Sequence, residues 1–315
     1  MRTGIAYGPA FGIDGSTVMV ERADGTRYRE HLDVGENPPN GAIVYYWLAS
    51  DAAGPLTLTF RDSAGRRIID YASNDETLLP ARRPGTKAGL NRYVWDMKYP
   101  GPTRLDYGLA PPRPKPLVPD PENPPGPTVV PGSYGVELTL GEKGKSKSYA
   151  AKFSVVKDPR LATTPAEYAA QFALHKDLIA SVSKLKRAVN RLRKMKRQLE
   201  EATEHLGKGE RALKNRAAAI VRKLSAIESV MVDPHRKSVR DVLRNPAGLN
   251  DTLIDMVAMA TTADRPPTSQ TTAVSREVMD KVDSEVARFE TLVAGDMAAL
   301  NAAFAKARVP HVTAV

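Results

Sequence analysis

The hydrophobic and polar positions follow different periods in the two halves of the chain. In the first half, short runs alternate, so that Leu56, Leu58 and Phe60 share one face. A period of two is typical of a β-sheet with one buried side. Runs of this kind predict strands at 17–22, 42–48, 56–62, 67–71, 91–97, 135–140 and 149–156. Short strands with frequent turns and no helical pattern between them favour an antiparallel β-sandwich.

The second half changes to a helical period of three and four. The segment 164–167 is a helix start, with a threonine cap, a proline at the first helical position and a glutamate that closes a capping box. Apolar residues then recur at heptad spacing over 178–199, and two glycines within 206–209 break the pattern. A second apolar stripe over 213–231 predicts that the two helices form a long antiparallel hairpin.

Two further helices are expected near the C-terminus. Asn250 can cap a helix that carries Leu253 and Val257, and a loop with two prolines leads to a last helix whose stripe runs from Val278 to Phe304. The predicted fold class is therefore α+β in two domains, an antiparallel immunoglobulin-like β-sandwich followed by an antiparallel α-helical bundle. The expected boundaries are 1–27 for a linker or edge strand, 28–157 for the sandwich, 163–306 for the bundle and 307–315 for a tail.

Residues 111–131 contain ten prolines in 21 positions. Because proline lacks a backbone donor and fixes φ, this segment is neither a central strand nor a helix. We expect a polyproline-like surface loop that joins two strands of the sandwich. A proline-rich ligand for an aromatic groove is the alternative.

The positive charge is concentrated in one helix. The chain carries a net charge of +10, and the segment 184–197 holds eight basic residues without one acidic residue. Such a segment can bind the phosphates of nucleic acid or anionic lipid, and the candidate anion-binding patch comprises Lys184, Arg187, Arg191 and Lys194. The patch has no interleaved aromatic residues, so it makes no strong case for nucleic acid. Acidic residues that can pair with it instead lie in the last helix: Glu277, Asp280, Asp283, Glu285 and Glu290.

The residue types that carry chemistry do not form a recognisable catalytic motif. The chain has no cysteine, which excludes disulfides and thiolate-ligated metals. Its five histidines are not at metal-ligand spacing, and no Gly-x-Ser-x-Gly elbow occurs. The segment 141–146 ends like a phosphate-binding loop, but Thr139 stands where the first glycine is required. We therefore predict no catalytic residue, no cofactor and no metal site.

Trp95, Asp96 and Glu36 are the candidate contacts for a carbohydrate or a partner. A Trp-Asp pair at a strand end can contact a sugar, because aromatic rings stack on apolar sugar faces, and paired carboxylates can hydrolyse glycosides. The competing interpretation makes Trp95 a core residue and Asp96 a turn former. No stretch has the roughly 20 apolar residues of a membrane span, and the N-terminus has no signal peptide, so the chain as written is expected in the cytoplasm.

Several segments resemble one known family. Residues 35–41 (GENPPNG), 43–46 (IVYY) and 88–96 (AGLNRYVWD) are similar to the C-terminal region of bacterial sortilin-like BNR-repeat propeller proteins, often labelled glycosyl hydrolases. Further matching segments are PGSY at 131–134, KDPR at 157–160 and AVNR at 188–191. The pattern of glycine, Trp-Asp and Pro-Gly-x-Tyr also resembles the immunoglobulin-like domain of flagellar hook-capping proteins.

The resemblance implies a role without catalysis for this region. In that family, propeller repeats precede this region and would carry any sugar-binding or hydrolytic site, and no Asp-box occurs in this sequence. We expect a structural or interaction module whose partner is a β-propeller, exported or periplasmic if it belongs to a longer precursor. A glycoside hydrolase or carbohydrate-binding component is the alternative, and anionic-polymer binding through 184–197 is the second. The sequence does not indicate an oligomeric state.

Overall fold

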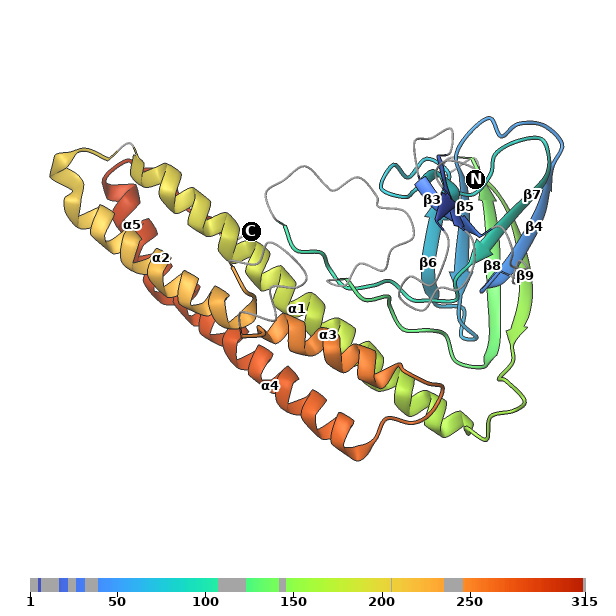
Figure 1. The fold of residues 1–315 in the computed structure, drawn as a ribbon. Helices are drawn as coiled ribbons and strands as arrows, with labels where there is room; N and C mark the ends of the chain where they lie inside the picture. Colours follow the sequence, from blue (N-terminus) through green and yellow to red (C-terminus); the bar gives the residue numbers. More distant parts are fainter. Residues whose placement is uncertain are drawn as a thin grey trace. The chain divides into compact units, whose positions relative to one another are not determined.

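The computed structural model shows a mixed chain of α-helices and antiparallel β-sheets (Figure 1). The residues that it describes are 5–6, 17–21, 27–31, 39–106, 123–141, 146–204, 206–234 and 246–313. The chain divides into two compact units, which we call the β unit and the helical unit. The β unit comprises 1–98, 109–119 and 132–156, and the helical unit comprises 99–108, 120–131 and 157–315.

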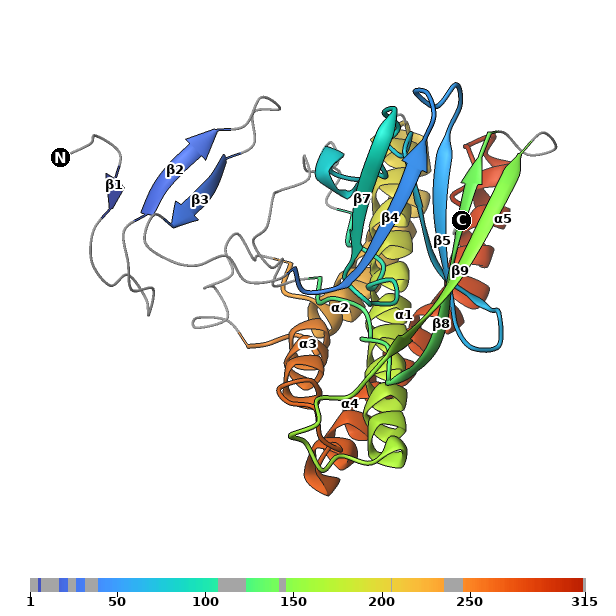
Figure 2. The same ribbon diagram turned by 90° about the vertical axis from the view of Figure 1, so that its right-hand side faces the viewer.

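Nine strands form three antiparallel sheets among the described residues. The strands are β1 (Ile5–Ala6), β2 (Thr17–Glu21), β3 (Arg27–His31), β4 (Ala42–Leu48), β5 (Leu56–Arg61), β6 (Arg67–Ala72), β7 (Gly89–Trp95), β8 (Gly132–Leu140) and β9 (Lys147–Val155). Their orders are β1-β2-β3, β4-β7 and β6-β5-β8-β9. A short 3₁₀ helix, η1 (Pro80–Arg82), lies between β6 and β7. Figure 2 shows β4 and β7 side by side as a two-stranded sheet.

Aromatic residues from the two-stranded and the four-stranded sheet build the core of the β unit. Trp95 of β7 stacks on Phe60 of β5, with ring centroids 4.2 Å apart and an angle of 20° between the planes. Both side chains are fully buried. Tyr71 of β6 meets Phe60 edge-on at 6.1 Å, and Tyr134 of β8 meets Trp95 at 6.4 Å. This stack holds the two-stranded sheet against the four-stranded sheet.

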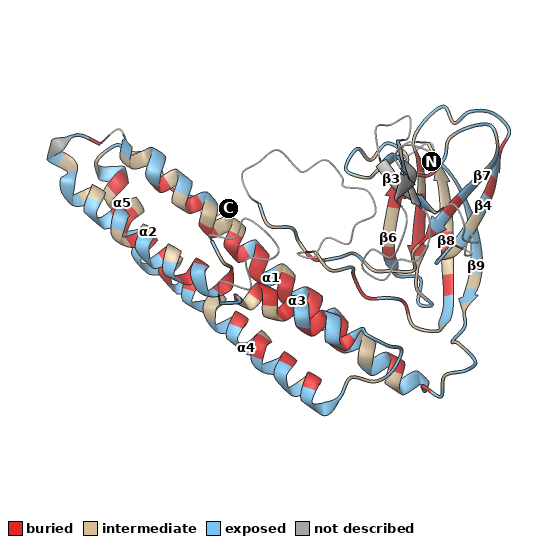
Figure 3. Cartoon of the chain, viewed as in Figure 1, coloured by how far each residue is buried: buried red, intermediate tan, exposed pale blue. Residues whose placement is uncertain are grey.

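The described residues of the helical unit form five α-helices that bury one another's apolar stripes. They are α1 (Pro165–Glu204), α2 (Arg211–Met231), α3 (Leu249–Ala260), α4 (Ser269–Leu292) and α5 (Ala298–Lys306). A 3₁₀ turn, η2 (Lys208–Glu210), precedes α2, and a π-helical turn, η4 (Val293–Met297), joins α4 to α5. Figures 1 and 2 show α1 alongside α3 and α4. Buried residues line one stripe of each long helix, and exposed residues line the opposite side (Figure 3).

The sequence signals at the start of α1 are confirmed. The Thr164 backbone N–H donates to Glu167 Oε2 at 2.7 Å, and the Glu167 backbone N–H donates to Thr164 Oγ1 at 3.3 Å. This reciprocal pair is the predicted capping box. The long helix ends at Glu204, before the glycines that were expected to break it.

Two helix predictions near the C-terminus differ from the structure. Asn250 does not cap α3, because the cap is Gly248 and Asn250 is buried in the first turn. A Cβ on Gly248 would lie 3.0 Å from the Met231 carbonyl oxygen, so the close approach of this chain segment to the end of α2 favours glycine at the cap. The expected last helix is interrupted by the π-helical turn, which inserts one residue into the helical repeat.

Three expected boundaries also differ. Strand β3 pairs with β2 in register from Thr17 opposite His31, so the boundary expected at 27/28 cuts through a hairpin, and β2 is a central strand of its own sheet. Residues 99–108 and 120–131 belong to the helical unit and not to the β unit. The segment expected to be a tail packs against the helices, because Val312 is buried in their core. The Val312 backbone also forms two hydrogen bonds with the Asn301 side chain.

Replacing Phe60 by alanine should destabilise the β unit by about 3–5 kcal/mol, because it removes a fully buried ring that stacks on Trp95. Both tryptophans of the chain lie in the β unit, so tryptophan fluorescence during urea unfolding reports on this unit. Tyr149→Ala, at an exposed position of β9, is the control and should change stability by no more than about 0.5 kcal/mol. An equal loss of stability in the two variants would contradict the role of Phe60 in the core.

The β unit should lose stability between about pH 10 and about pH 12. Burial raises the pKa of Tyr46 and of Tyr71 to about 12. Tyrosines of the unfolded chain ionise near pH 10, so above that pH the unfolded state releases protons that the folded state keeps. Urea midpoints should therefore fall with rising pH, and less steeply in Tyr46→Phe and Tyr71→Phe than in the exposed control Tyr149→Phe. If the urea midpoints of all three variants fell equally steeply with pH, the raised pKa values of Tyr46 and Tyr71 would be contradicted.

Candidate functional site

Two described segments lie along α1, the helix that carries the basic residues. We call residues 99–106 and 123–131 the strap. The Thr103 backbone N–H donates to Ser183 Oγ at 3.1 Å. The Asn190 amide accepts from the Asp106 N–H at 2.7 Å and donates to the Arg104 carbonyl oxygen at 2.9 Å. A side-chain amide that both accepts from and donates to a passing backbone fixes that backbone on the helix.

The strap is packed and is not a solvent-exposed loop. Lys186 of α1 is fully buried, and its ammonium donates to Asn123 Oδ1 at 2.9 Å. Gly126 of the strap is also buried, and a Cβ there would lie 2.1 Å from the Tyr99 carbonyl oxygen. The expectation of a surface loop over 111–131 therefore fails at Gly126, Pro127 and Val129, which are buried, whereas Pro125 and Thr128 are exposed. Residues 111–122 lie outside the described part of the chain.

The predicted anion-binding patch is largely engaged within the helical unit. Lys184 pairs with Asp283 of α4 at 2.7 Å, and Arg191 pairs with Glu290 at 2.5 Å. The Arg191 guanidinium also lies 5.3 Å from the centroid of the Phe289 ring. The two other candidates are exposed: Arg187 donates to Thr103 Oγ1 at 3.4 Å, and Lys194 has partners within the fold. Interhelix pairing, the competing interpretation of this segment, accounts for Lys184 and Arg191.

A buried carboxylate that the sequence did not single out completes this network. Glu228 of α2 is 6% exposed and accepts from Arg193 at 2.7 Å and from Lys196 at 3.1 Å. In the sequence of α2, Glu228 simply follows the apolar Ile227. Its role as a buried acceptor becomes visible only from the arginine and the lysine of α1 that face it. Arg197 lies 3.6 Å from Asp106 of the strap. The basic helix thus meets acidic groups from α2, α4 and the strap.

Two of the three candidate carbohydrate contacts, Trp95 and Asp96, lie in the described part of the chain. Trp95 is fully buried in the stack with Phe60, so its ring faces are covered and cannot receive a sugar. Asp96 is partly exposed, and its carboxylate lies 3.7 Å from the Arg82 guanidinium of η1. Glu36 lies outside the described residues. The burial of Trp95 agrees with its interpretation as a core residue.

The outer face of the two-stranded sheet is an exposed apolar surface of the β unit. Because Tyr46, Leu48, Tyr93 and Trp95 point inward, the alternate residues of β4 and β7 point outward. The register places three outward pairs opposite each other: Ile43 with Val94, Tyr45 with Arg92, and Trp47 with Leu90. The exposed fractions are 41% for Ile43, 58% for Tyr45, 71% for Trp47, 67% for Leu90 and 36% for Val94. We call these six residues the outer face.

Arg92 is the one charged member of the outer face. It sits opposite Tyr45 and between Leu90 and Val94 on its own strand. Within the described part of the chain, its side chain is exposed and makes no hydrogen bond or ion pair. Both strands were predicted from the sequence, but this face was not. The sequence of β4 contained a signal for it, because the odd-numbered and the even-numbered residues of this strand are all apolar or aromatic. One of these two sets must face outward.

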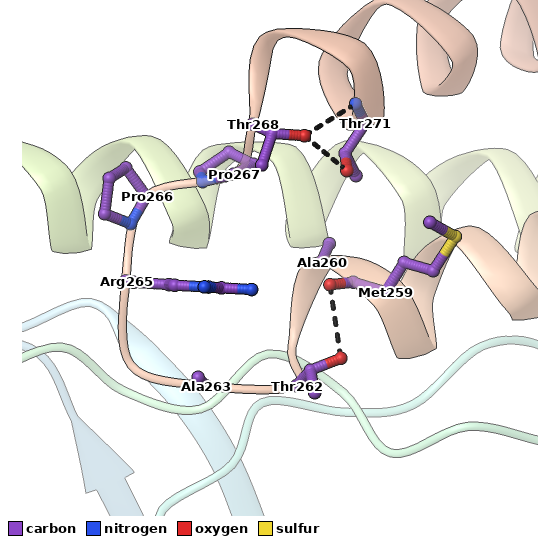
Figure 4. A pocket seen from close by; sticks show the side chains of 9 residues that line it. All are labelled: Met259, Ala260, Thr262, Ala263, Arg265, Pro266, Pro267, Thr268 and Thr271. Atoms are coloured by element: carbon purple, nitrogen blue, oxygen red, sulfur yellow. Dashed lines mark hydrogen bonds between the residues drawn. The ribbon is translucent and has the colours of Figure 1, made fainter.

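A small pocket of about 270 Å³ lies in the helical unit, where α3 is connected to α4 (Figure 4). Its walls include Met259, Pro266 and Pro267, and the Arg265 side chain extends along it. Thr268 caps α4 by accepting from the Thr271 N–H at 3.1 Å. The Thr268 and Thr271 hydroxyls therefore serve the start of α4, and the Thr262 hydroxyl donates to the Ala258 carbonyl oxygen near the end of α3.

Among the residues that the structure describes, no three histidine, aspartate or glutamate side chains gather closely enough to hold a metal ion. Over the same part of the chain, no helix combines the length and the apolar character that crossing a membrane requires.

Replacing Glu228 by glutamine should destabilise the helical unit by about 3 kcal/mol, because Arg193 and Lys196 would lose their shared buried carboxylate. Glu290→Gln is the matched control. Its carboxylate is half exposed, so the loss should stay within about 1 kcal/mol. Far-ultraviolet circular dichroism during urea unfolding measures both variants. A Glu228→Gln variant as stable as the control would contradict the network.

Comparison with known proteins gave no match. No protein-family model, no curated protein and no solved structure matches it. The outer face and the internally paired basic helix are therefore the features from which a function has to be argued.

Proposed function

We propose that this chain is a non-catalytic interaction module that binds another protein through the outer face of its two-stranded sheet. In this proposal the β unit is an immunoglobulin-like sandwich, and the helices form an antiparallel bundle. The observation that carries the proposal is the exposure of Tyr45, Trp47 and Leu90 side by side. Large contiguous apolar patches are unusual on surfaces that bind nothing.

The composition of the outer face supports a protein partner. Tryptophan, tyrosine and arginine are enriched at interface hot spots, and the outer face contains one of each, adjacent across two paired strands. Aliphatic residues lie at both ends, with Ile43 and Val94 at one end and Leu90 at the other. They would shield the central contacts from water in a complex.

The resemblance of residues 35–46 and 88–96 to propeller-associated regions suggests the class of partner. We propose a β-propeller, encoded near this chain or fused to it in an ancestor. Part of the outer face lies in these segments, because Ile43, Tyr45, Leu90, Arg92 and Val94 fall within them. A carbohydrate is the second candidate, since exposed Trp47 and Tyr45 rings can also stack on a sugar.

Trp47→Ala combined with Leu90→Ala should abolish binding to the propeller protein encoded next to this chain. Truncation of a hot-spot side chain commonly costs about 2 kcal/mol or more of binding free energy. Isothermal titration calorimetry with the purified propeller measures the affinity, and tryptophan fluorescence confirms that Trp95 stays buried. Tyr149→Ala is the control and should bind as the wild type does.

Two other results would count against a protein partner. If the wild-type chain forms no complex with the propeller, the propeller is not its partner. Binding to an array of oligosaccharides that disappears in the double variant would favour the carbohydrate alternative.

A further inference from the structure

We infer that the protein bound by the outer face presents an acidic side chain, surrounded by apolar residues, and that Arg92 is the group that binds it. The inference rests on the proposed function and adds the chemistry of the partner. It follows from the position of one guanidinium, which has no partner among the described residues, within an apolar surface.

Arg92 lies at the centre of the outer face and not at its rim. Its cross-strand neighbour is Tyr45, and its neighbours along β7 on the same face are Leu90 and Val94. Diagonal neighbours in an antiparallel pair are about 7–8 Å away, which brings Ile43 and Trp47 into reach. Any large surface that covers the aromatic and aliphatic members must therefore also cover the guanidinium.

Covering Arg92 requires an acceptor. A guanidinium that loses its water without gaining hydrogen bonds costs several kcal/mol, which outweighs most apolar contacts. A carboxylate can accept two parallel hydrogen bonds from it, with a geometry that lysine does not offer. A partner with an aspartate or glutamate at this point would satisfy Arg92, and a partner with only apolar groups there would not.

Other occupants fit less well. A symmetric contact with a second copy, centred on the Tyr45–Arg92 pair, would bring two guanidinium groups together. A sugar would find one arginine and one tyrosine hydroxyl for its many hydroxyl groups, while the exposed Ile43, Leu90 and Val94 would face polar atoms. A protein surface with one carboxylate matches both the apolar and the charged members.

Photo-cross-linking can identify the partner. p-Benzoylphenylalanine replaces Tyr45 in the full chain, the chain is irradiated in an extract of the cells that produce it, and mass spectrometry locates the cross-linked peptide. The identified protein is then purified, and its affinity for the wild-type chain is measured by calorimetry. We expect the cross-linked surface to contain an aspartate or glutamate between apolar residues.

Substitutions in the purified complex test the role of Arg92. Arg92→Gln should weaken binding at least about tenfold, and Arg92→Lys should restore only part of the loss, since lysine lacks the paired donors. Arg92→Glu combined with a lysine in place of the partner's acidic residue should recover binding. Arg216→Gln, at an exposed position of α2, is the matched control and should bind as the wild type does.

The outcomes separate this inference from the proposed function. Binding that depends on Trp47 and Leu90 but is unchanged in Arg92→Gln would overturn the inference and leave the interaction module intact. A cross-link to another segment of the same chain, to a second copy, or to no protein at all would overturn both.

Discussion

The burial of Trp95 against Phe60 fixes which side of the small sheet faces water. With Trp95 and Tyr93 turned toward the four-stranded sheet, the pleat of β7 turns Leu90, Arg92 and Val94 outward. The antiparallel register then brings the outward residues of β4 beside them. The exposure of Trp47 and the full burial of Trp95 thus have one cause, because both residues belong to the same paired sheet.

Much of the secondary structure could be predicted, because it depends on neighbours in sequence. The capping box of α1 needs only residues 164–167, and the alternation of β5 needs only its own six residues. The failures involve contacts between distant segments. Asn250 has the right chemistry for a cap, but the approach of Gly248 to the end of α2 sets the boundary of α3. Of the two tryptophans, only the packing against Phe60 shows that Trp95 is the buried one.

The basic helix illustrates how charge density alone misleads. Eight cations in 14 positions suggest a surface for polyanions, yet Lys184, Arg191 and Arg193 point to carboxylates on α4 and α2. Each pair removes a charge that a phosphate would otherwise use. The acidic partners on α4 could be proposed from the sequence, since they recur along one helix. Glu228 and Asp106 could not, because no pattern shows that α2 and the strap meet this side of α1.

The strap has a consequence for how such a chain can evolve. Because residues 99–106 and 123–131 belong to the helical unit while β7 and β8 belong to the β unit, the boundary between the units is crossed several times along the sequence. A single recombination breakpoint near 157 would deliver the helices without the acceptor of buried Lys186 and without Leu105, which packs on their core. The two units are therefore expected to be inherited together, as one interleaved piece and not as exchangeable parts.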